Sequence, residues 1–153
     1  YRFGLVDETV RVNDEQTPHF MDRLGRELGG FEGKTVALVG LAFKPNTDDI
    51  RDARSLLMIR RLEREGATIR ACDPEAVEAV RKLHPDVTYV RDAYEAVDDA
   101  DAVVLVTEWP EYRQLDLRAL RKRMRGDLFF DGRRVVDRKA AENAGLRYFT
   151  IGG

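Results

Sequence analysis

Three cationic side chains in this sequence stand where they could bind an anionic ligand. Lys44 and Arg51 belong to the stretch Gly40–Arg51, which follows an apolar run, and Arg133 belongs to the segment Asp131-Gly132-Arg133-Arg134. Ammonium and guanidinium groups pair with phosphate or carboxylate oxygens, and an arginine can do so through two parallel hydrogen bonds. The alternative is a set of solvated loop cations, each paired with a nearby carboxylate. We favour binding, because all three are expected at one edge of the fold.

Two aromatic residues are candidates for stacking on a base or forming the wall of a pocket. Phe43 precedes Lys44, and Trp109 follows the apolar run 102–107. Aromatic residues near strand ends also commonly form the margin of a core. Trp109 is predicted to be the more exposed of the two, because Pro110 keeps the preceding residue out of helical geometry.

The carboxylates and the cysteine do not form a recognisable reactive centre. Asp48, Asp49 and Asp52 are too close in sequence to converge readily on a divalent cation, and Asp52 is interpreted as a helix N-cap. Cys72 ends an apolar strand with no histidine nearby in sequence, so it is interpreted as a small buried hydrophobic residue. We therefore predict neither a catalytic residue nor a metal ligand in this chain.

The first strand-to-helix loop lacks the glycines that let a backbone approach a pyrophosphate. Leu41, Ala42 and Phe43 follow Gly40, so no G-x-G-x-x-G fingerprint is present. Asp73 ends the second expected strand, where a dinucleotide fold places its ribose-binding acid, but with Pro74 it is also explained as a helix cap. The absence of this fingerprint indicates that the domain does not bind NAD through its own main fold.

The elements that must position these residues alternate between strands and helices. The N-terminal segment 8–28 is predicted to be a helix with an apolar stripe of Phe20, Leu24 and Leu28, and it ends at Gly29-Gly30. The alternation that follows predicts an α/β fold: a doubly wound, Rossmann-like parallel sheet of about six strands preceded by a helix. The expected strands are 35–40, 67–72, 87–90, 102–107, 128–130 and 146–151. Two regions are expected, 1–30 and 34–153.

The composition excludes several classes of protein. The 153 residues carry a net charge of −2 with 35% charged side chains, so no basic field indicates nucleic-acid binding. A single cysteine fits a reducing compartment, and a cytoplasmic location is expected. No apolar stretch approaches the length of a membrane span. The chain starts at Tyr1 without an initiator methionine, so we expect a processed or excised piece.

Four motifs together resemble one family. Gly40–Arg51, Asp73-Pro74, Thr107-Glu108-Trp109 and Phe130-Asp131-Gly132-Arg133 are similar, in order and spacing, to the C-terminal domain of the UDP-glucose/GDP-mannose dehydrogenase family. The members that act on UDP-glucose are the ones most similar at Thr107-Glu108-Trp109 and Asp131-Gly132-Arg133. Residues 1–30 resemble the end of the central helix through which that family dimerises.

The resemblance implies a function and a role for each candidate. It implies an NAD-dependent, two-step oxidation of UDP-glucose to UDP-glucuronate, with a catalytic cysteine and an NAD domain that precede this region. By position, Phe43, Lys44 and Arg133 would contact the UDP-sugar, and Arg51 would reach the NAD. The fragment alone is expected to bind but not catalyse, and the intact enzyme is expected to be a homodimer.

Other functions remain open at this point. The sugar nucleotide could instead be UDP-N-acetylmannosamine or GDP-mannose, since dehydrogenases for these share the first loop. A second class is a non-catalytic dimerisation or nucleotide-binding module that uses the N-terminal apolar stripe. A third is a phosphorylation-regulated receiver-like domain with Asp48 or Asp49 as the acceptor.

Overall fold

A single six-stranded parallel sheet organises the computed structural model, which describes residues 16–151. The strand order is β3-β2-β1-β4-β5-β6, and every neighbouring pair is parallel. Val39 at the end of β1 pairs with Cys72 of β2 on one side and with Leu105 of β4 on the other. The strands are β1 (Thr35–Val39), β2 (Thr68–Cys72), β3 (Thr88–Tyr89), β4 (Ala102–Leu105), β5 (Leu128–Asp131) and β6 (Arg147–Thr150).

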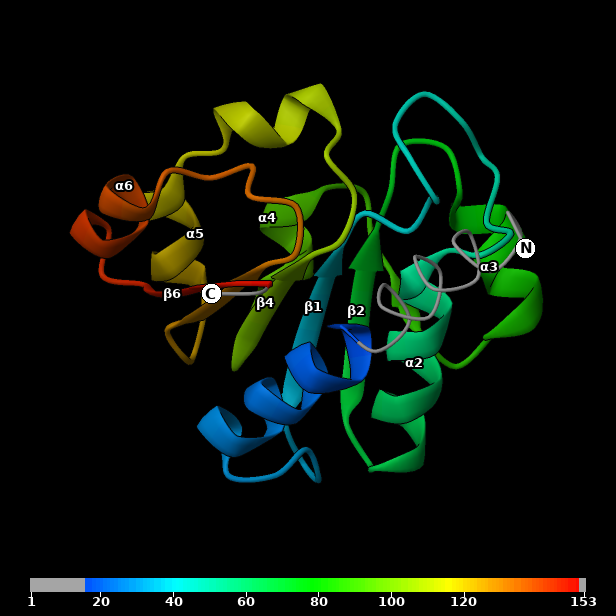
Figure 1. Ribbon diagram of the computed structural model, residues 1–153, viewed down its shortest axis with the longest axis horizontal. Coiled ribbons are helices and arrows are strands. Elements are labelled where there is room, and N and C mark those ends of the chain that lie inside the picture. The colour runs from blue at the N-terminus through cyan, green and yellow to red at the C-terminus, as the bar shows by residue number, and fades with distance from the viewer. Residues whose placement is uncertain (1–15, 152–153) are drawn as a thin grey trace, which may run out of the picture.

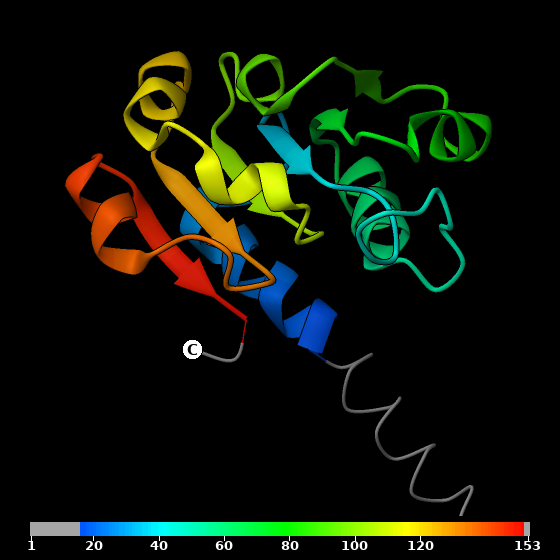
Figure 2. The same cartoon turned by 90° about the horizontal axis from the view of Figure 1, so that it is seen from above.

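Helices cover both faces of the sheet, which confirms the predicted doubly wound α/β class. The N-terminal helix, α2 and α3 lie on one face, and α4, α5 and α6 lie on the other (Figures 1 and 2). The winding reverses between β1 and β4, because the chain builds outward from β1 in both directions. The helices are α2 (Arg54–Arg64), α3 (Val77–Leu83), α4 (Ala93–Ala96), α5 (Leu117–Arg123) and α6 (Arg138–Asn143), and η1 (Pro110–Gln114) is a 3₁₀ helix.

The N-terminal helix packs its apolar stripe against its own sheet. The structure describes it from residue 16 to residue 28, and the predicted part before residue 16 lies outside the described residues. Phe20 and Leu24 are buried, and the ring of Phe20 meets that of Phe130 edge-on with 5.3 Å between centroids. Leu28 is partly buried against the same core. Most of the stripe that suggested an exposed interface is thus covered within the chain.

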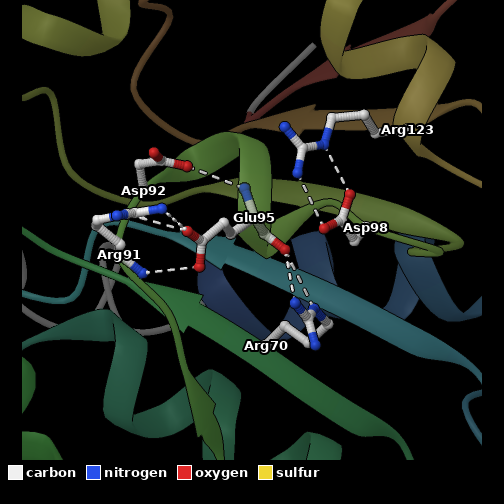
Figure 3. Close-up of polar contacts among 6 residues, drawn as sticks. All are labelled: Arg70, Arg91, Asp92, Glu95, Asp98 and Arg123. Carbon is white, nitrogen blue, oxygen red and sulfur yellow. Dashed lines mark hydrogen bonds and ion pairs between the residues drawn. The ribbon is translucent and has the colours of Figure 1, made fainter.

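The short helix α4 is held in place by arginine side chains from outside it (Figure 3). Arg70 of β2 donates from Nη2 to the backbone oxygen of Glu95 at 2.7 Å, which satisfies a carbonyl at the end of the helix. Arg91 pairs with the Glu95 carboxylate, and Arg123 of α5 pairs with Asp98 through two hydrogen bonds of 2.7 and 3.0 Å. A helix of four residues has little stability of its own, so these contacts and its buried alanines fix its place.

Aspartate side chains cap α4 and α5, whereas α2 has no side-chain cap. The carboxylate of Asp92 accepts from the backbone N–H of Glu95, and that of Asp116 accepts from Ala119, as capping residues do. The N-cap prediction for Asp52 is wrong. Asp52 has a left-handed φ of 60°, and Ala53 precedes the first turn of α2 without any side-chain cap.

Two further structural properties bear on function. Among residues 16–151, no helix is long and apolar enough to cross a membrane. Within the same range, no group of three or more histidine, cysteine or acidic side chains is placed to hold a metal ion.

Candidate functional site

The loops that carry the candidate residues meet at the carboxyl edge of the sheet. The chain leaves β1 at Gly40, β2 at Asp73, β4 at Val106 and β5 at Gly132. Since the strands are parallel and adjacent, these four exits lie side by side, with the reversal of winding between β1 and β4. An open α/β sheet binds its ligands at such a position.

The first loop leaves β1 in close contact with the loop after β4. Gly40 has a φ of 97°, and a Cβ built on it would lie 2.8 Å from the backbone nitrogen of Thr107. Its N–H donates to the carbonyl of Cys72 at 2.9 Å. Only glycine combines this left-handed backbone with so close a neighbour.

The backbone of the next two residues is fully used inside the protein. One oxygen of Asp73 accepts from the N–H groups of Leu41 at 2.7 Å and Ala42 at 3.0 Å. The hydroxyl of Ser55 donates to the Leu41 carbonyl, and that of Thr107 donates to the Ala42 carbonyl, both at 2.7 Å. No backbone donor of this pair is left for a phosphate, so Leu41 and Ala42 do not form a main-chain phosphate cradle.

Trp109 is buried, and the prediction that it is the more exposed aromatic residue is wrong. It does adopt the extended backbone expected before Pro110, with φ −60° and ψ 140°. Its indole Nε1, however, donates to Asp73 at 3.1 Å, and only 5% of the residue is exposed. The other oxygen of Asp73 accepts from the N–H groups of Glu75 and Ala76. Asp73 therefore caps a turn after β2, and α3 itself begins only at Val77.

Three predicted ligand residues surround one hollow at this edge. Phe43, Lys44 and Arg133 line it with the apolar side chains of Ala42 and Val106, and Arg54 of α2 completes the lining. Phe43 is 50% exposed, so its ring is available to a ligand.

Arg133 is held in place by Glu108 from the neighbouring strand end. Its Nε and Nη2 both donate to the Glu108 carboxylate, with 3.0 Å between Nη2 and Oε1. These hydrogen bonds lower the pKa of Glu108 below its usual value. The pairing uses one edge of the guanidinium and leaves Nη1 for another acceptor. The lining of the hollow thus includes the cations Lys44, Arg54 and Arg133, and the carboxylate of Glu108 pairs with Arg133.

Arg51 does not line the hollow. Its side chain is 87% exposed and pairs with Asp49, with 3.0 Å between Nη2 and Oδ2 and 3.1 Å between Nε and Oδ1. Hydrogen bonds from Arg51 lower the pKa of Asp49 to about 2. For this cation the structure shows the carboxylate pairing that the sequence left open as the alternative.

Cys72 has the properties of an inert core residue. Its side chain is buried, and burial raises the pKa of its thiol to about 12. A thiol with this pKa is almost entirely protonated at neutral pH, and the thiolate is the nucleophilic form.

Sequence reasoning missed Arg54, and it misread what Asp73 and Trp109 do. The sequence did contain a signal for Arg54. A cation in the first turn of a helix interacts unfavourably with the helix dipole, so its presence there indicates a possible functional role. No acidic residue stands in the first turn of α2. The bond between Asp73 and Trp109 joins residues 36 positions apart, and no local pattern predicts it.

The sequence matches one protein family along most of its length. The family described as "UDP-glucose/GDP-mannose dehydrogenase family, UDP binding domain" matches residues 37–138. The UDP-glucose 6-dehydrogenase TuaD of Bacillus subtilis is 36% identical over 153 residues, covering 99% of this chain and 33% of that protein. The UDP-glucose 6-dehydrogenase AglM of Haloferax volcanii is 42% identical over 141 residues, covering 91% of this chain and 32% of that protein.

Solved structures show the same relationship. A UDP-glucose dehydrogenase from the hyperthermophilic archaeon Pyrobaculum islandicum superposes with a TM-score of 0.78 at 38% identity, over 93% of this chain and 31% of that one. A GDP-mannose dehydrogenase from Pseudomonas aeruginosa, at 21% identity and a TM-score of 0.69, covers 97% of this chain and 34% of that one and shares the fold. The chain spans about a third of the length of the curated relatives that it matches.

Proposed function

The chain belongs to the UDP-glucose/GDP-mannose dehydrogenase family, and from this premise we propose that it is the UDP-sugar-binding domain of an NAD-dependent UDP-glucose 6-dehydrogenase. The observation that carries the proposal is the hollow that brings Phe43, Lys44 and Arg133 together at the switch point of the sheet. The cationic side chains in its lining suit a diphosphate, and the exposed ring of Phe43 suits a base or a sugar face.

The choice of UDP-glucose over other sugar nucleotides rests on the relatives. The relatives named above that share 36–42% of their residues with this chain are UDP-glucose enzymes, whereas the GDP-mannose dehydrogenase shares 21%. UDP-N-acetylmannosamine and GDP-mannose are the ligands to compare.

In the proposed reaction, the C6 alcohol of UDP-glucose becomes a carboxylate while two NAD⁺ accept hydride and one water is consumed. This chain would hold the nucleotide, because the described residues that line the hollow include no cysteine, histidine or carboxylate. Its first loop does not fit a dinucleotide, since the Leu41 and Ala42 backbone and both oxygens of Asp73 are already bonded. Arg51, exposed at the far end of that loop, is the residue proposed to reach NAD held by another domain.

Assembly and location are also proposals. A homodimer and a cytoplasmic location follow from the family resemblance and the single cysteine. The buried apolar stripe of the N-terminal helix does not by itself support the dimer, because Phe20 and Leu24 face their own sheet.

A ligand titration tests the binding proposal directly. UDP, UDP-glucuronate and GDP would each be added to the ¹⁵N-labelled chain, and the backbone amide signals would be followed by NMR. We expect UDP and UDP-glucuronate to shift the amides of residues 41–44 and 132–134, and GDP to shift them less. No shift at these residues at millimolar UDP would overturn the proposal for the isolated chain. A stronger response to GDP would favour a GDP-sugar.

A further inference from the structure

Buried Asp73 occupies a central place in the site without facing the hollow. We propose that Asp73 is a positioning residue that joins the first loop to Trp109 and so sets the affinity of the hollow for a nucleoside diphosphate. This inference rests on the proposed function. It assigns to this acid the task of fixing two loops, in the place where a dinucleotide fold uses an acid to bind ribose.

The geometry around Asp73 links three strand ends. Asp73 follows β2, the residues Leu41 and Ala42 follow β1, and Trp109 lies beyond β4. β1 lies between β2 and β4 (Figure 1). The hydrogen bond from Trp109 to Asp73 therefore joins loops on either side of β1. One carboxylate oxygen receives three N–H groups, at 2.7, 3.0 and 3.1 Å. Asp73 thereby links the first loop to the loops that follow β2 and β4.

The bonded residues lead directly into the ligand-facing ones. Phe43 and Lys44 follow Ala42 in the chain and line the hollow, whereas Asp73 does not line it. If Leu41 and Ala42 lose their acceptor, their backbone keeps the bonds from Ser55 and Thr107 to its carbonyl groups but loses both N–H bonds, so the two side chains that follow are less firmly positioned. A ligand must then order the loop when it binds, and this ordering weakens affinity.

A carboxylate is the group that this arrangement requires. Asp73 is 7% exposed and accepts five N–H groups, two of them on the oxygen that faces Glu75 and Ala76. An asparagine would replace one acceptor oxygen by an NH₂ group, whose hydrogens would face backbone or indole N–H groups that are also donors. Bonds to a charged acceptor are also stronger than neutral ones.

The experiment uses Trp109 as a built-in probe, because it is the only tryptophan in the sequence. Its indole N–H gives a single NMR signal that reports on the bond to Asp73. The variants are Asp73→Asn and the milder Trp109→Phe, which removes one donor and keeps an aromatic ring. The matched control is Asp101→Asn, at the opposite edge of the sheet, where the carboxylate accepts the Thr35 N–H at 2.8 Å and pairs with Arg125.

In Asp73→Asn we expect the indole signal to shift and the amides of Leu41 and Ala42 to exchange with solvent faster. The Kd for UDP should rise about tenfold, which corresponds to about 1.4 kcal/mol. For Trp109→Phe we expect a smaller rise, about threefold, because two of the three donors remain. Asp101→Asn should lower the melting temperature while leaving the Kd for UDP within about twofold.

The outcomes separate this inference from the proposed function. If the wild-type chain does not bind UDP, the proposed function fails for the isolated chain, and amide exchange at Leu41 and Ala42 still decides what Asp73 does. Unchanged exchange and an unchanged indole signal in Asp73→Asn would overturn the inference. So would a Kd no higher than that of Asp101→Asn. If Asp73→Asn does not fold, the Trp109→Phe variant decides through amide exchange at Leu41 and Ala42 and through its Kd for UDP, because it has no indole signal.

Discussion

Replacing Arg133 by alanine should separate ligand binding from folding. The side chain is 32% exposed, and among residues 16–151 its ionic partner is Glu108, which is 28% exposed. An ion pair this accessible to water contributes about 0.5–1 kcal/mol, and after its removal water can reach Glu108. For a domain of this size, each kcal/mol changes the melting temperature by about 2–4 °C, so we expect a fall of about 1–4 °C.

The effect on binding should be larger. A hydrogen bond from a charged donor to a charged acceptor is worth about 1.5–3 kcal/mol, and its loss raises Kd about 10- to 150-fold. The measurements are thermal unfolding by circular dichroism and calorimetric titration with UDP. Arg123→Ala is the control, since Arg123 makes a similar double hydrogen bond to Asp98 away from the hollow (Figure 3).

Arg133 should also change the dependence of stability on pH. It lowers the pKa of Glu108 in the folded state, so the free energy gained from the pair is fully present above the ordinary pKa of 4.5. That contribution disappears as the pH falls through the lowered value. The difference in unfolding free energy between wild type and Arg133→Ala should therefore shrink in acid. Equal UDP affinities for Arg133→Ala and Arg123→Ala, or unfolding of Arg133→Ala, would refute this reasoning.

Three further variants test other parts of the site. Lys44→Ala and Arg51→Ala should both leave the domain folded. In the intact enzyme, Lys44→Ala should raise KM for the UDP-sugar, and Arg51→Ala should raise KM for NAD. Unfolding of either variant would show that the loop has a structural role instead. Gly40→Ala should destabilise by at least about 2 kcal/mol in urea denaturation, because the left-handed backbone and the contact with Thr107 both exclude a Cβ; a loss near zero would contradict that packing. Cys72 should resist alkylation at pH 8 in the native chain and react on unfolding, and rapid native labelling would contradict its raised pKa.

The sheet and its functional edge could be predicted from the sequence because their signals are local. Residues 102–106 are apolar throughout, as expected for a strand covered on both faces, and the structure places β4 within that run. The parallel order then brings the loops with Lys44 and Arg133 to one edge without any knowledge of their contacts. A binding role for these residues stays a prediction.

The errors share a different cause. Pro110 predicts an exposed Trp109, but the side chain is buried. Its indole N–H donates to Asp73, which lies 36 positions earlier. Aspartate is a common N-cap residue, but Asp52 itself adopts a left-handed backbone conformation and does not cap α2. Arg51 had three acidic neighbours, and only coordinates could show that Asp49 binds it. Contacts between distant segments and individual backbone angles are not contained in local periodicity.

The internal bonding of the Leu41 and Ala42 backbone has a consequence for how this domain can evolve. A fold that cradles a phosphate with main-chain N–H groups keeps that ligand through almost any exchange of side chains. In the proposed site, recognition depends on side chains such as Phe43 and Lys44, which follow a backbone segment that internal hydrogen bonds hold in place. If the proposal holds, a single codon change at such a position can alter which sugar nucleotide is preferred while the hydrogen-bonded backbone beneath it stays the same.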